Sequence, residues 1–268
     1  MKWCDKKIKD YWNRQAIKYG QSQSASWSDH YVIDMEIKEI SKYLPFFTET
    51  KCPDFVNKET LDIGCANGYS TMKYASRPGL NIKGIDYSPD MIAEARKRFI
   101  DSGENLSSVV FEEGNILSLE EKEGFYDIII CTRVLINLGS LENQLLALNS
   151  LAKPLKKGGL LLLSEATIQG WNNLNAFRGE FGLSGIPMPP FNLYLDEDKV
   201  IEVLFDDFEL WEINNFASSY YVGTRVFKPL IGENSYSRNP LTHMNRFMSQ
   251  FPNIGDYGIQ KLFIFSKK

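Results

Sequence analysis

The sequence is poor in the residues from which metal sites and disulfide frameworks are built. Its 268 residues include four cysteines and two histidines, and no two cysteines form a Cys-x-x-Cys pair. Structural zinc sites usually take four closely spaced Cys and His ligands, so no metal site is expected. Cys65 and Cys131 fall at predicted buried strand ends, which is typical of free thiols in a reducing cytosol.

Long apolar runs and a surplus of basic residues are also missing. No uninterrupted apolar run exceeds four residues, whereas a transmembrane helix needs about 20. The first residues, MKWCDKKIKDYW, lack the apolar core of a signal peptide. The net charge is −4, and nucleic-acid binding usually shows as a basic surplus. These absences predict a cytoplasmic protein with neither a membrane nor a nucleic acid as partner, and they leave the oligomeric state open.

Strand and helix patterns alternate through the middle of the chain. Apolar strand patterns are followed by helical ones, and Ser88 with Pro89 reads as the start of a helix. This alternation predicts an α/β fold with a doubly wound, mostly parallel sheet. The expected strands are 60–64, 80–86, 107–114, 126–131 and 160–166. The expected helices between them are 69–76, 88–100 and 141–155.

The two ends of the chain have a different character. Two helices are predicted first, at 7–19 and at 30–44, with Pro45 ending the second and a linker over 45–59. After Ala166 the regular pattern gives way to long stretches rich in Gly, Pro and Asn, and such stretches in compact domains usually serve as binding loops. Within this last third we expect a helix at 196–205 and strands at 208–216 and 261–267.

The stretch LDIGCANG, residues 61–68, predicts a ligand site after the first strand. Its small residues let a ligand approach the backbone, but the spacing departs from the G-x-G-x-x-G pattern of dinucleotide sites. The acid at Asp62 would repel a pyrophosphate and would suit a ligand with an ammonium group. Asp86 ends the second strand, where a carboxylate can accept ribose hydroxyls. A ligand with a ribose and a positive charge, such as S-adenosylmethionine, meets both conditions.

Five segments in order resemble the motifs of class I S-adenosylmethionine-dependent methyltransferases. They are LDIGCANG, GIDYSPDMIAEAR, EEGNILSL, YDIIICTRVLINL and LKKGGLLLLSE, and together they cover roughly residues 59 to 166. The resemblance implies a Rossmann-like sheet of seven strands, the last of them antiparallel, and S-adenosyl-L-methionine as the cofactor. The cofactor-binding residues that it implies, with two aromatic residues from the N-terminal segment, are Asp62, Gly64, Cys65, Ala66, Gly68, Asp86, Tyr87, Met91, Asn115, Ile116, Thr132, Tyr19 and Trp27.

The resemblance also suggests a division of the chain. We expect one methyltransferase domain over 1–268, with an N-terminal helical cap at 1–45 and the cofactor-binding core at 59–166. Two insertions, 167–198 and 217–258, are interpreted as substrate lids. We further expect residues 20–29 and 217–240 to be mobile without ligand and ordered with it.

The methyl acceptor is expected to be a small polar metabolite or sugar precursor, anionic rather than neutral, with O-methylation favoured. His30 and His243 are the candidate general bases for a hydroxyl acceptor. Aromatic and cationic residues of the two insertions are candidate substrate contacts: Trp171, Arg178, Tyr220, Tyr221, Arg225 and Lys228. The alternatives are a protein or RNA methyltransferase, and a domain that binds the cofactor without catalysis.

Overall fold

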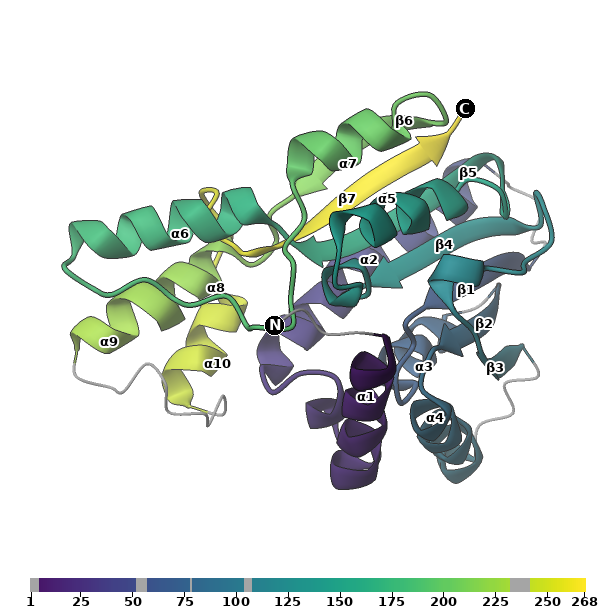
Figure 1. Cartoon of the computed structure of the whole chain (residues 1–268), viewed down its shortest axis with the longest axis horizontal. Helices are drawn as coiled ribbons and strands as arrows, with labels where there is room; N and C mark the ends of the chain where they lie inside the picture. The colour runs from purple at the N-terminus through teal and green to yellow at the C-terminus, as the bar shows by residue number, and fades with distance from the viewer. Residues whose placement is uncertain (1–4, 52–56, 78, 104–107, 232–241) are drawn as a thin grey trace.

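The computed structural model describes residues 5–51, 57–77, 79–103, 108–231 and 242–268. At its centre lies one seven-stranded sheet with the strand order β3-β2-β1-β4-β5-β7-β6 (Figure 1). β1 to β5 run parallel to one another, and β7 pairs antiparallel with both β5 and β6. This confirms the expected doubly wound sheet with an antiparallel last strand. The strands are β1 (Lys58–Ile63), β2 (Leu80–Asp86), β3 (Val109–Glu113), β4 (Tyr126–Thr132), β5 (Leu155–Ala166), β6 (Phe208–Asn214) and β7 (Gln260–Lys267).

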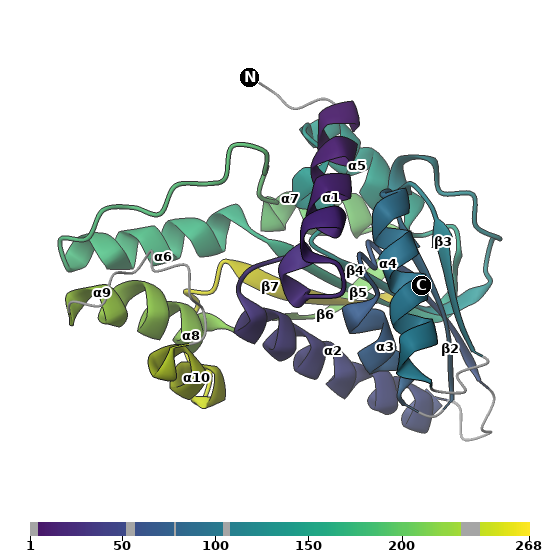
Figure 2. The ribbon, with the colours of Figure 1, turned by 90° about the horizontal axis from the view of Figure 1, so that it is seen from below.

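Helices cover both faces of the sheet (Figure 2). Because successive strand side chains point to opposite faces, Leu160 and Leu162 pack on one face while Leu161 and Leu163 pack on the other. The first face carries α2 (His30–Lys51), α3 (Tyr69–Ala75) and α4 (Pro89–Ser102), and the second carries α5 (Leu141–Ser150) and α7 (Glu197–Leu204). The strands of the parallel core are therefore buried on both faces, as their continuous apolar sequences predict.

The ends of the elements follow local signals, with one exception. Ser88 caps α4 as predicted, because its Oγ accepts the N–H of Met91 at 3.1 Å and Pro89 is the first helical residue. The prediction that Pro45 ends the second helix is wrong, since α2 continues to Lys51. A proline inside a helix costs roughly 3 kcal/mol, and the long buried face of α2, which includes Val32 and Ile40, offsets this cost. Of the predicted linker at 45–59, residues 52–56 lie outside the described part of the chain.

The two stretches expected to be irregular contain helices that gather at one end of the sheet (Figure 1). Thr167 caps the first of them by accepting the N–H of Gly170 at 3.1 Å. The Gly- and Asn-rich sequence has low helix propensity, and burial of Leu174 and Arg178 outweighs it. The part 232–241 lies outside the described residues. The helices are α6 (Ile168–Glu180), α8 (Ser218–Val222), the π-helical turn η4 (Gly223–Phe227), α9 (Lys228–Leu230) and α10 (His243–Gln250).

Candidate functional site

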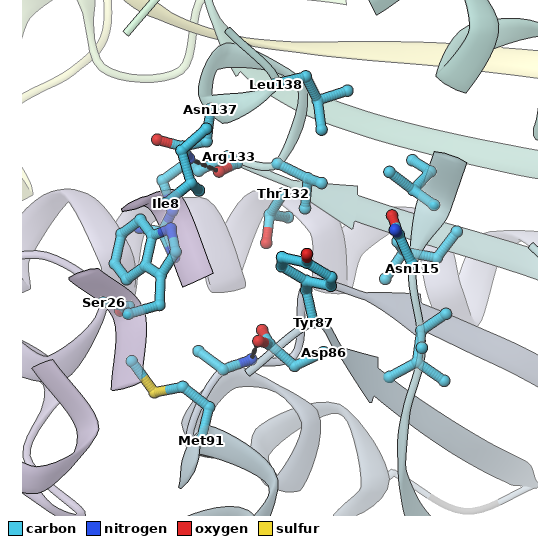
Figure 3. Close-up of a pocket in the computed structure, with 18 of the residues that line it drawn as sticks. Ile8, Ser26, Asp86, Tyr87, Met91, Asn115, Thr132, Arg133, Asn137 and Leu138 are labelled. Carbon is cyan, nitrogen blue, oxygen red and sulfur yellow. Dashed lines mark hydrogen bonds between the residues drawn. The ribbon is translucent and has the colours of Figure 1, made fainter. Parts of the chain in front are cut away.

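A pocket opens at the carboxyl ends of β1 to β4, which we call the strand-end pocket (Figure 3). The chain order of the strands reverses between β1 and β4, and ligands of open α/β sheets bind at such a reversal. α1 (Asp5–Tyr19) closes the pocket from the other side. Its lining residues are Ile8, Trp12, Ser26, Ile63, Gly64, Ala66, Ile85, Asp86, Tyr87, Met91, Gly114, Asn115, Ile116, Leu117, Thr132, Arg133, Val134, Asn137 and Leu138.

The turn after β1 brings bare backbone to the wall of this pocket. The N–H groups of Gly64 and Cys65 both donate to the carbonyl of Ile85, at 2.8 and 3.0 Å. Gly64 has φ +78°, and a Cβ there would lie 2.2 Å from Cγ2 of Val134. A side chain at this position is therefore unfavourable for two reasons: the backbone would be strained, and the Cβ would clash with Val134.

Asp86 presents a carboxylate to the same pocket from the end of β2. Its Oδ2 accepts the N–H of Ala66 at 2.9 Å, and its Oδ1 accepts the N–H of Ser88 at 2.8 Å. These two bonds fix the carboxylate between the β1 turn and the start of α4. Burial raises the pKa of Asp86 to about 6, although the two backbone N–H groups oppose this shift. At neutral pH the group is an ionised acceptor with oxygen lone pairs left for ligand hydroxyls.

The far end of the pocket carries a polar group of a different kind. Asn115 follows β3, and its Oδ1 accepts the N–H of Leu117 at 3.0 Å. Because the oxygen is used in this way, the amide Nδ2 is left to donate. Ile116 and Leu117 lie beside it. The pocket thus offers a carboxylate near one end, an amide donor near the other and apolar surface between them.

Eight of the thirteen predicted cofactor residues line the strand-end pocket, namely Gly64, Ala66, Asp86, Tyr87, Met91, Asn115, Ile116 and Thr132. The other residues of the first motif lie behind it. Asp62 is 1% exposed, and its Oδ2 accepts the hydroxyl of Thr71 at 2.6 Å. Burial raises its pKa to about 7. Asp62 therefore does not face a ligand ammonium in this structure, and it braces the turn against α3.

The remaining motif residues also support the turn rather than line it. Cys65 is buried as a free thiol. Gly68 has φ +73°, and a Cβ there would lie 2.9 Å from the ring of Phe111. The close packing of α3 and α4 against the sheet thus explains this second glycine.

Arg133, which was not among the predicted site residues although it lies in the segment YDIIICTRVLINL, stands at the end of β4 and lines the pocket. Its φ is +56°, which is unusual for a residue with a side chain. Its N–H donates to Ser164 O at 2.9 Å, and its carbonyl accepts from Asn137 Nδ2 at 2.7 Å. Strained backbone of this kind persists where its surroundings over-determine it, which is common at functional sites. Its place directly after a parallel strand was the signal that could have identified it.

Glu165 holds the turn that follows Arg133. Its Oε1 accepts the N–H groups of Val134 and Leu135, both at 2.7 Å. Burial raises the pKa of Glu165 to about 8, against the lowering effect of these bonds. A buried carboxylate on β5 thus positions the wall that β4 contributes.

A second and larger hollow, which we call the cap chamber, adjoins the strand-end pocket. Its volume is about 790 Å³. Trp12, Ser26, Arg133 and Asn137 line both hollows and form the wall that they share. The other residues that line the cap chamber are Tyr11, Gln15, Tyr19, Ser24, Trp27, Ser28, His30, Ile136, Ala166, Ile186, Pro187, Pro189, Phe191, Asn192, Tyr194, Tyr221, Arg225, Ile259 and Gln260.

Five of the predicted residues lie in the cap chamber. Tyr19 and Trp27, expected beside the cofactor, line it, and so do Tyr221 and Arg225, expected at the substrate. His30 lines it as well, with its Nε2 2.8 Å from Ser24 Oγ.

The other predicted residues are placed elsewhere. His243 is exposed at the first position of α10. Trp171 donates its indole N–H to Ile186 O at 2.9 Å. Arg178 donates to Ser184 O at 2.7 Å, and Lys228 donates to Asn245 Oδ1 at 3.1 Å. Tyr220 is buried and donates to Asp29 at 2.7 Å. None of these five lines either hollow, and the hydrogen bonds of the four other than His243 help to hold α6 and α8 to α10 in place.

The strand-end pocket fits S-adenosylmethionine by the chemistry of its lining. Asp86 supplies the acceptor that ribose hydroxyls need, and Asn115 supplies a donor for an adenine edge. The cradle at Gly64, which a Cβ would fill, allows close approach to the backbone. In the described part of the chain no group of His, Cys, Asp and Glu could hold a metal ion. Among the described helices, none has the length and apolar character of a membrane span.

Comparison with known proteins agrees with this geometry. A family model described as a methyltransferase domain matches residues 54–183. A tRNA U34 carboxymethyltransferase of Wolinella succinogenes is 32% identical over 150 residues, which cover 54% of this chain and 49% of that protein. The chain spans about half the length of the curated relatives it matches.

Solved structures extend the likeness over nearly the whole chain. The magnesium protoporphyrin IX methyltransferase of Synechocystis PCC 6803, with bound SAH, has a TM-score of 0.60 at 17% identity, covering 97% of this chain and 94% of that one. The N-methyltransferase NodS of Bradyrhizobium japonicum WM9, in complex with S-adenosyl-L-homocysteine, has a TM-score of 0.54 at 17% identity, covering 95% and 98%. At such identities the likeness concerns the fold.

Proposed function

We propose that the chain, whose residues 54–183 match a methyltransferase-domain model, is a class I S-adenosylmethionine-dependent methyltransferase that methylates a small molecule held in the cap chamber. The observation that carries the proposal is the wall common to the two hollows, formed by Trp12, Ser26, Arg133 and Asn137. A cofactor in the strand-end pocket and an acceptor in the cap chamber would therefore lie next to each other at these shared residues. Holding two reactants in such proximity can supply roughly 7–11 kcal/mol of the barrier.

The residues of the strand-end pocket have the binding role. Bound S-adenosylmethionine supplies a methyl group that its positive sulfonium already activates. Asp86 would accept the ribose hydroxyls, and Asn115 would donate to the adenine. Ile8 and Trp12 on α1 line the pocket and would exclude water from the bound cofactor.

The cap chamber offers donors suited to a polar acceptor. Tyr194 and Tyr221 line it. Burial raises the pKa of Tyr194 to about 12 and raises that of Tyr221 well above its usual value. Both hydroxyls therefore stay protonated at neutral pH and can donate to oxygen atoms of an acceptor.

His30 is the candidate general base. It faces the cap chamber and contacts the Ser24 hydroxyl at 2.8 Å, whereas His243 lies outside both hollows. A hydroxyl acceptor is a poor nucleophile at neutral pH, and a positioned base contributes on the order of 10²–10⁴ in rate. This favours O-methylation with His30 taking the hydroxyl proton.

The experiment compares classes of acceptor. The purified chain is incubated with S-adenosylmethionine that carries a labelled methyl group and with either a panel of hydroxylated small metabolites or total tRNA. We expect label in the small-molecule arm. Label in tRNA alone would overturn the proposal in favour of the RNA alternative, to which the similarity to a tRNA U34 carboxymethyltransferase points. No label in either arm, with cofactor bound, would favour a binding domain without catalysis.

The role of His30 is tested with the same assay. His30→Gln should lower kcat by about 10²-fold on a hydroxyl acceptor, while His243→Gln should leave it unchanged. Equal activity of His30→Gln and the parent chain would remove His30 as the base.

A further inference from the structure

The charged side chains on the wall of the cap chamber are both cations. Arg133 and Arg225 line it, and among its described lining residues none is Asp or Glu. The chain as a whole has 34 acidic and 30 basic residues, so the charge on this wall is opposite in sign to the net charge of the chain. A wall with cationic groups and without carboxylates favours a ligand that carries negative charge.

Arg225 already forms an ion pair that links two helices. Its Nη2 donates to Asp29 Oδ2 at 2.6 Å, and its guanidinium lies 5.8 Å from the centre of the Tyr221 ring. Asp29 is 4% exposed and also accepts the Tyr220 hydroxyl. This network ties the start of α2 to α8, and its arginine has its charge balanced at short distance.

Arg133 is placed differently. Its Nη1 is 3.4 Å from Glu36 Oε2, and neither of these two buried atoms has a hydrogen-bond partner in the described part of the chain. The other oxygen of Glu36 accepts from Ser164 at 2.6 Å and from Gln260 at 3.2 Å, so Glu36 itself is fixed. Nη1 thus faces Glu36 through a loose ionic contact, while the Arg133 side chain, which is 14% exposed at the chamber wall, can offer its other N–H groups to a ligand.

The surface around Arg133 is aromatic. Its guanidinium lies 5.6 Å from the centre of the Trp27 ring. The ring of Tyr11 lies 5.1 Å from that of Phe191, which joins α1 to the segment after α6 across the chamber. The aromatic residues that line the chamber are Tyr11, Trp12, Tyr19, Trp27, Phe191, Tyr194 and Tyr221. Such a lining suits a planar, ring-containing ligand.

Resting on the proposed function, we infer that the acceptor is an aromatic carboxylate and that Arg133 binds its carboxylate at the wall between the two hollows. The planar fork of an arginine matches two carboxylate oxygens. A single negative charge is favoured over a doubly charged phosphate, because Glu36 and Asp29 already balance part of the cationic charge. Arg133 would thereby set both the choice of acceptor and its orientation toward the cofactor.

The test measures binding of defined aromatic acids and their neutral counterparts by calorimetry, with the chain saturated by S-adenosylhomocysteine. The probes are 4-hydroxybenzoate and 3,4-dihydroxybenzoate, each beside its amide. On the parent chain we expect each acid to bind at least about tenfold more tightly than its amide, as hydrogen bonds to a charged group predict. Arg133→Met should lower acid affinity to that of the amide and leave amide affinity unchanged. Arg246→Met, which removes an exposed arginine of α10, is the matched control and should bind like the parent chain.

Three results would overturn the inference: no acid binds, acid and amide bind alike on the parent chain, or Arg133→Met keeps the preference for the acid. Arg133→Lys keeps the charge without the fork and should give an intermediate preference, so the inference is testable even if Arg133→Met folds poorly. A cofactor role for Arg133 is tested with 5′-methylthioadenosine, which lacks the amino-acid carboxylate of S-adenosylhomocysteine. If Arg133→Met weakens S-adenosylhomocysteine but not 5′-methylthioadenosine, Arg133 binds the cofactor and the acceptor assignment is wrong. Failure of the parent chain to bind S-adenosylhomocysteine would refute the proposed function itself.

Discussion

The backbone N–H of Ala66 donates to Oδ2 of Asp86 at 2.9 Å, so the turn after β1 is tied to the end of β2. This bond joins two segments that are 20 residues apart in sequence. The bond from Ser88 N–H to Oδ1 of the same carboxylate adds the start of α4 to the junction. The two sequence motifs for which a cofactor site was predicted are therefore parts of one hydrogen-bonded unit.

Replacement of Gly64 tests how much the turn depends on bare backbone. Gly64→Ala should weaken S-adenosylhomocysteine binding and lower stability by about 2–5 kcal/mol, because left-handed strain of about 1–2 kcal/mol adds to overpacking of about 1–3 kcal/mol. The clash is with Val134 Cγ2, 2.2 Å from the new Cβ. Gly79→Ala is the matched control, since Gly79 has φ +81° and a Cβ there would meet no atom within 4 Å. Titration with S-adenosylhomocysteine and urea unfolding should show only the effect of backbone strain in Gly79→Ala. Equal losses of affinity and stability in both variants would contradict the packing argument.

Asp62 should make stability depend on pH. Its pKa is raised by burial from 3.8 to about 7 in the folded protein. Between these values the folded state binds more protons than the unfolded chain, so the free energy of unfolding falls as pH rises and the contribution is lost through about pH 7. Each unit of the shift corresponds to roughly 1.4 kcal/mol.

Asp62→Asn isolates this effect, because an amide oxygen can still accept the Thr71 hydroxyl. Urea unfolding at about pH 5.5 and about pH 8 should show a smaller loss of stability in the variant than in the parent chain. The comparison of slopes is necessary because Asp86 and Glu165, also buried with raised pKa values, titrate in both proteins. Identical slopes would show that Asp62 does not carry the predicted shift.

The buried pair of Asp29 and Arg225 is expected to couple the segment 20–29 to the segment 218–231. Asp29→Asn leaves Arg225 without its ionic partner and should cost about 1–3 kcal/mol. The amide hydrogens of both segments, residues 20–29 and 218–231, should then exchange faster than in the parent chain, with and without S-adenosylhomocysteine. Asp10→Asn, at an exposed position of α1, is the control. Faster exchange in one segment alone would show that the pair does not link them.

The fold could be predicted because its signals are local. The strand β2 was predicted at its observed bounds, and the cap at Ser88 was read from one Ser-Pro pair. The helices α6, α8, α9 and α10 could not be predicted in this way. α6 has a sequence rich in Asn and Gly, and its stability comes from burial of Leu174 and from contacts of Arg178 with residues beyond the helix.

The site was predictable only where a motif marks it. Gly64, Ala66 and Asp86 were found because the turn and the strand end leave a recognisable spacing. Arg133 lies within the segment YDIIICTRVLINL, but no spacing singles it out there, and its environment is assembled from Trp27, Glu36 and Ser164, which come from distant segments. The same limit applies to Asp62, whose acid was visible in sequence while its burial behind the turn was not.

Titration of S-adenosylhomocysteine into the parent chain and into Asp86→Ala tests the central claim most directly. Removing the Asp86 carboxylate leaves ribose hydroxyls unpaired in a buried site, so the variant should lose about 1–3 kcal/mol of binding free energy. Circular dichroism of the variant should stay that of the parent chain. We predict one binding site in the parent chain and an affinity about 5- to 150-fold lower in Asp86→Ala. Equal affinity in the two proteins, or no binding by the parent chain, would contradict the assignment of the strand-end pocket as the cofactor site.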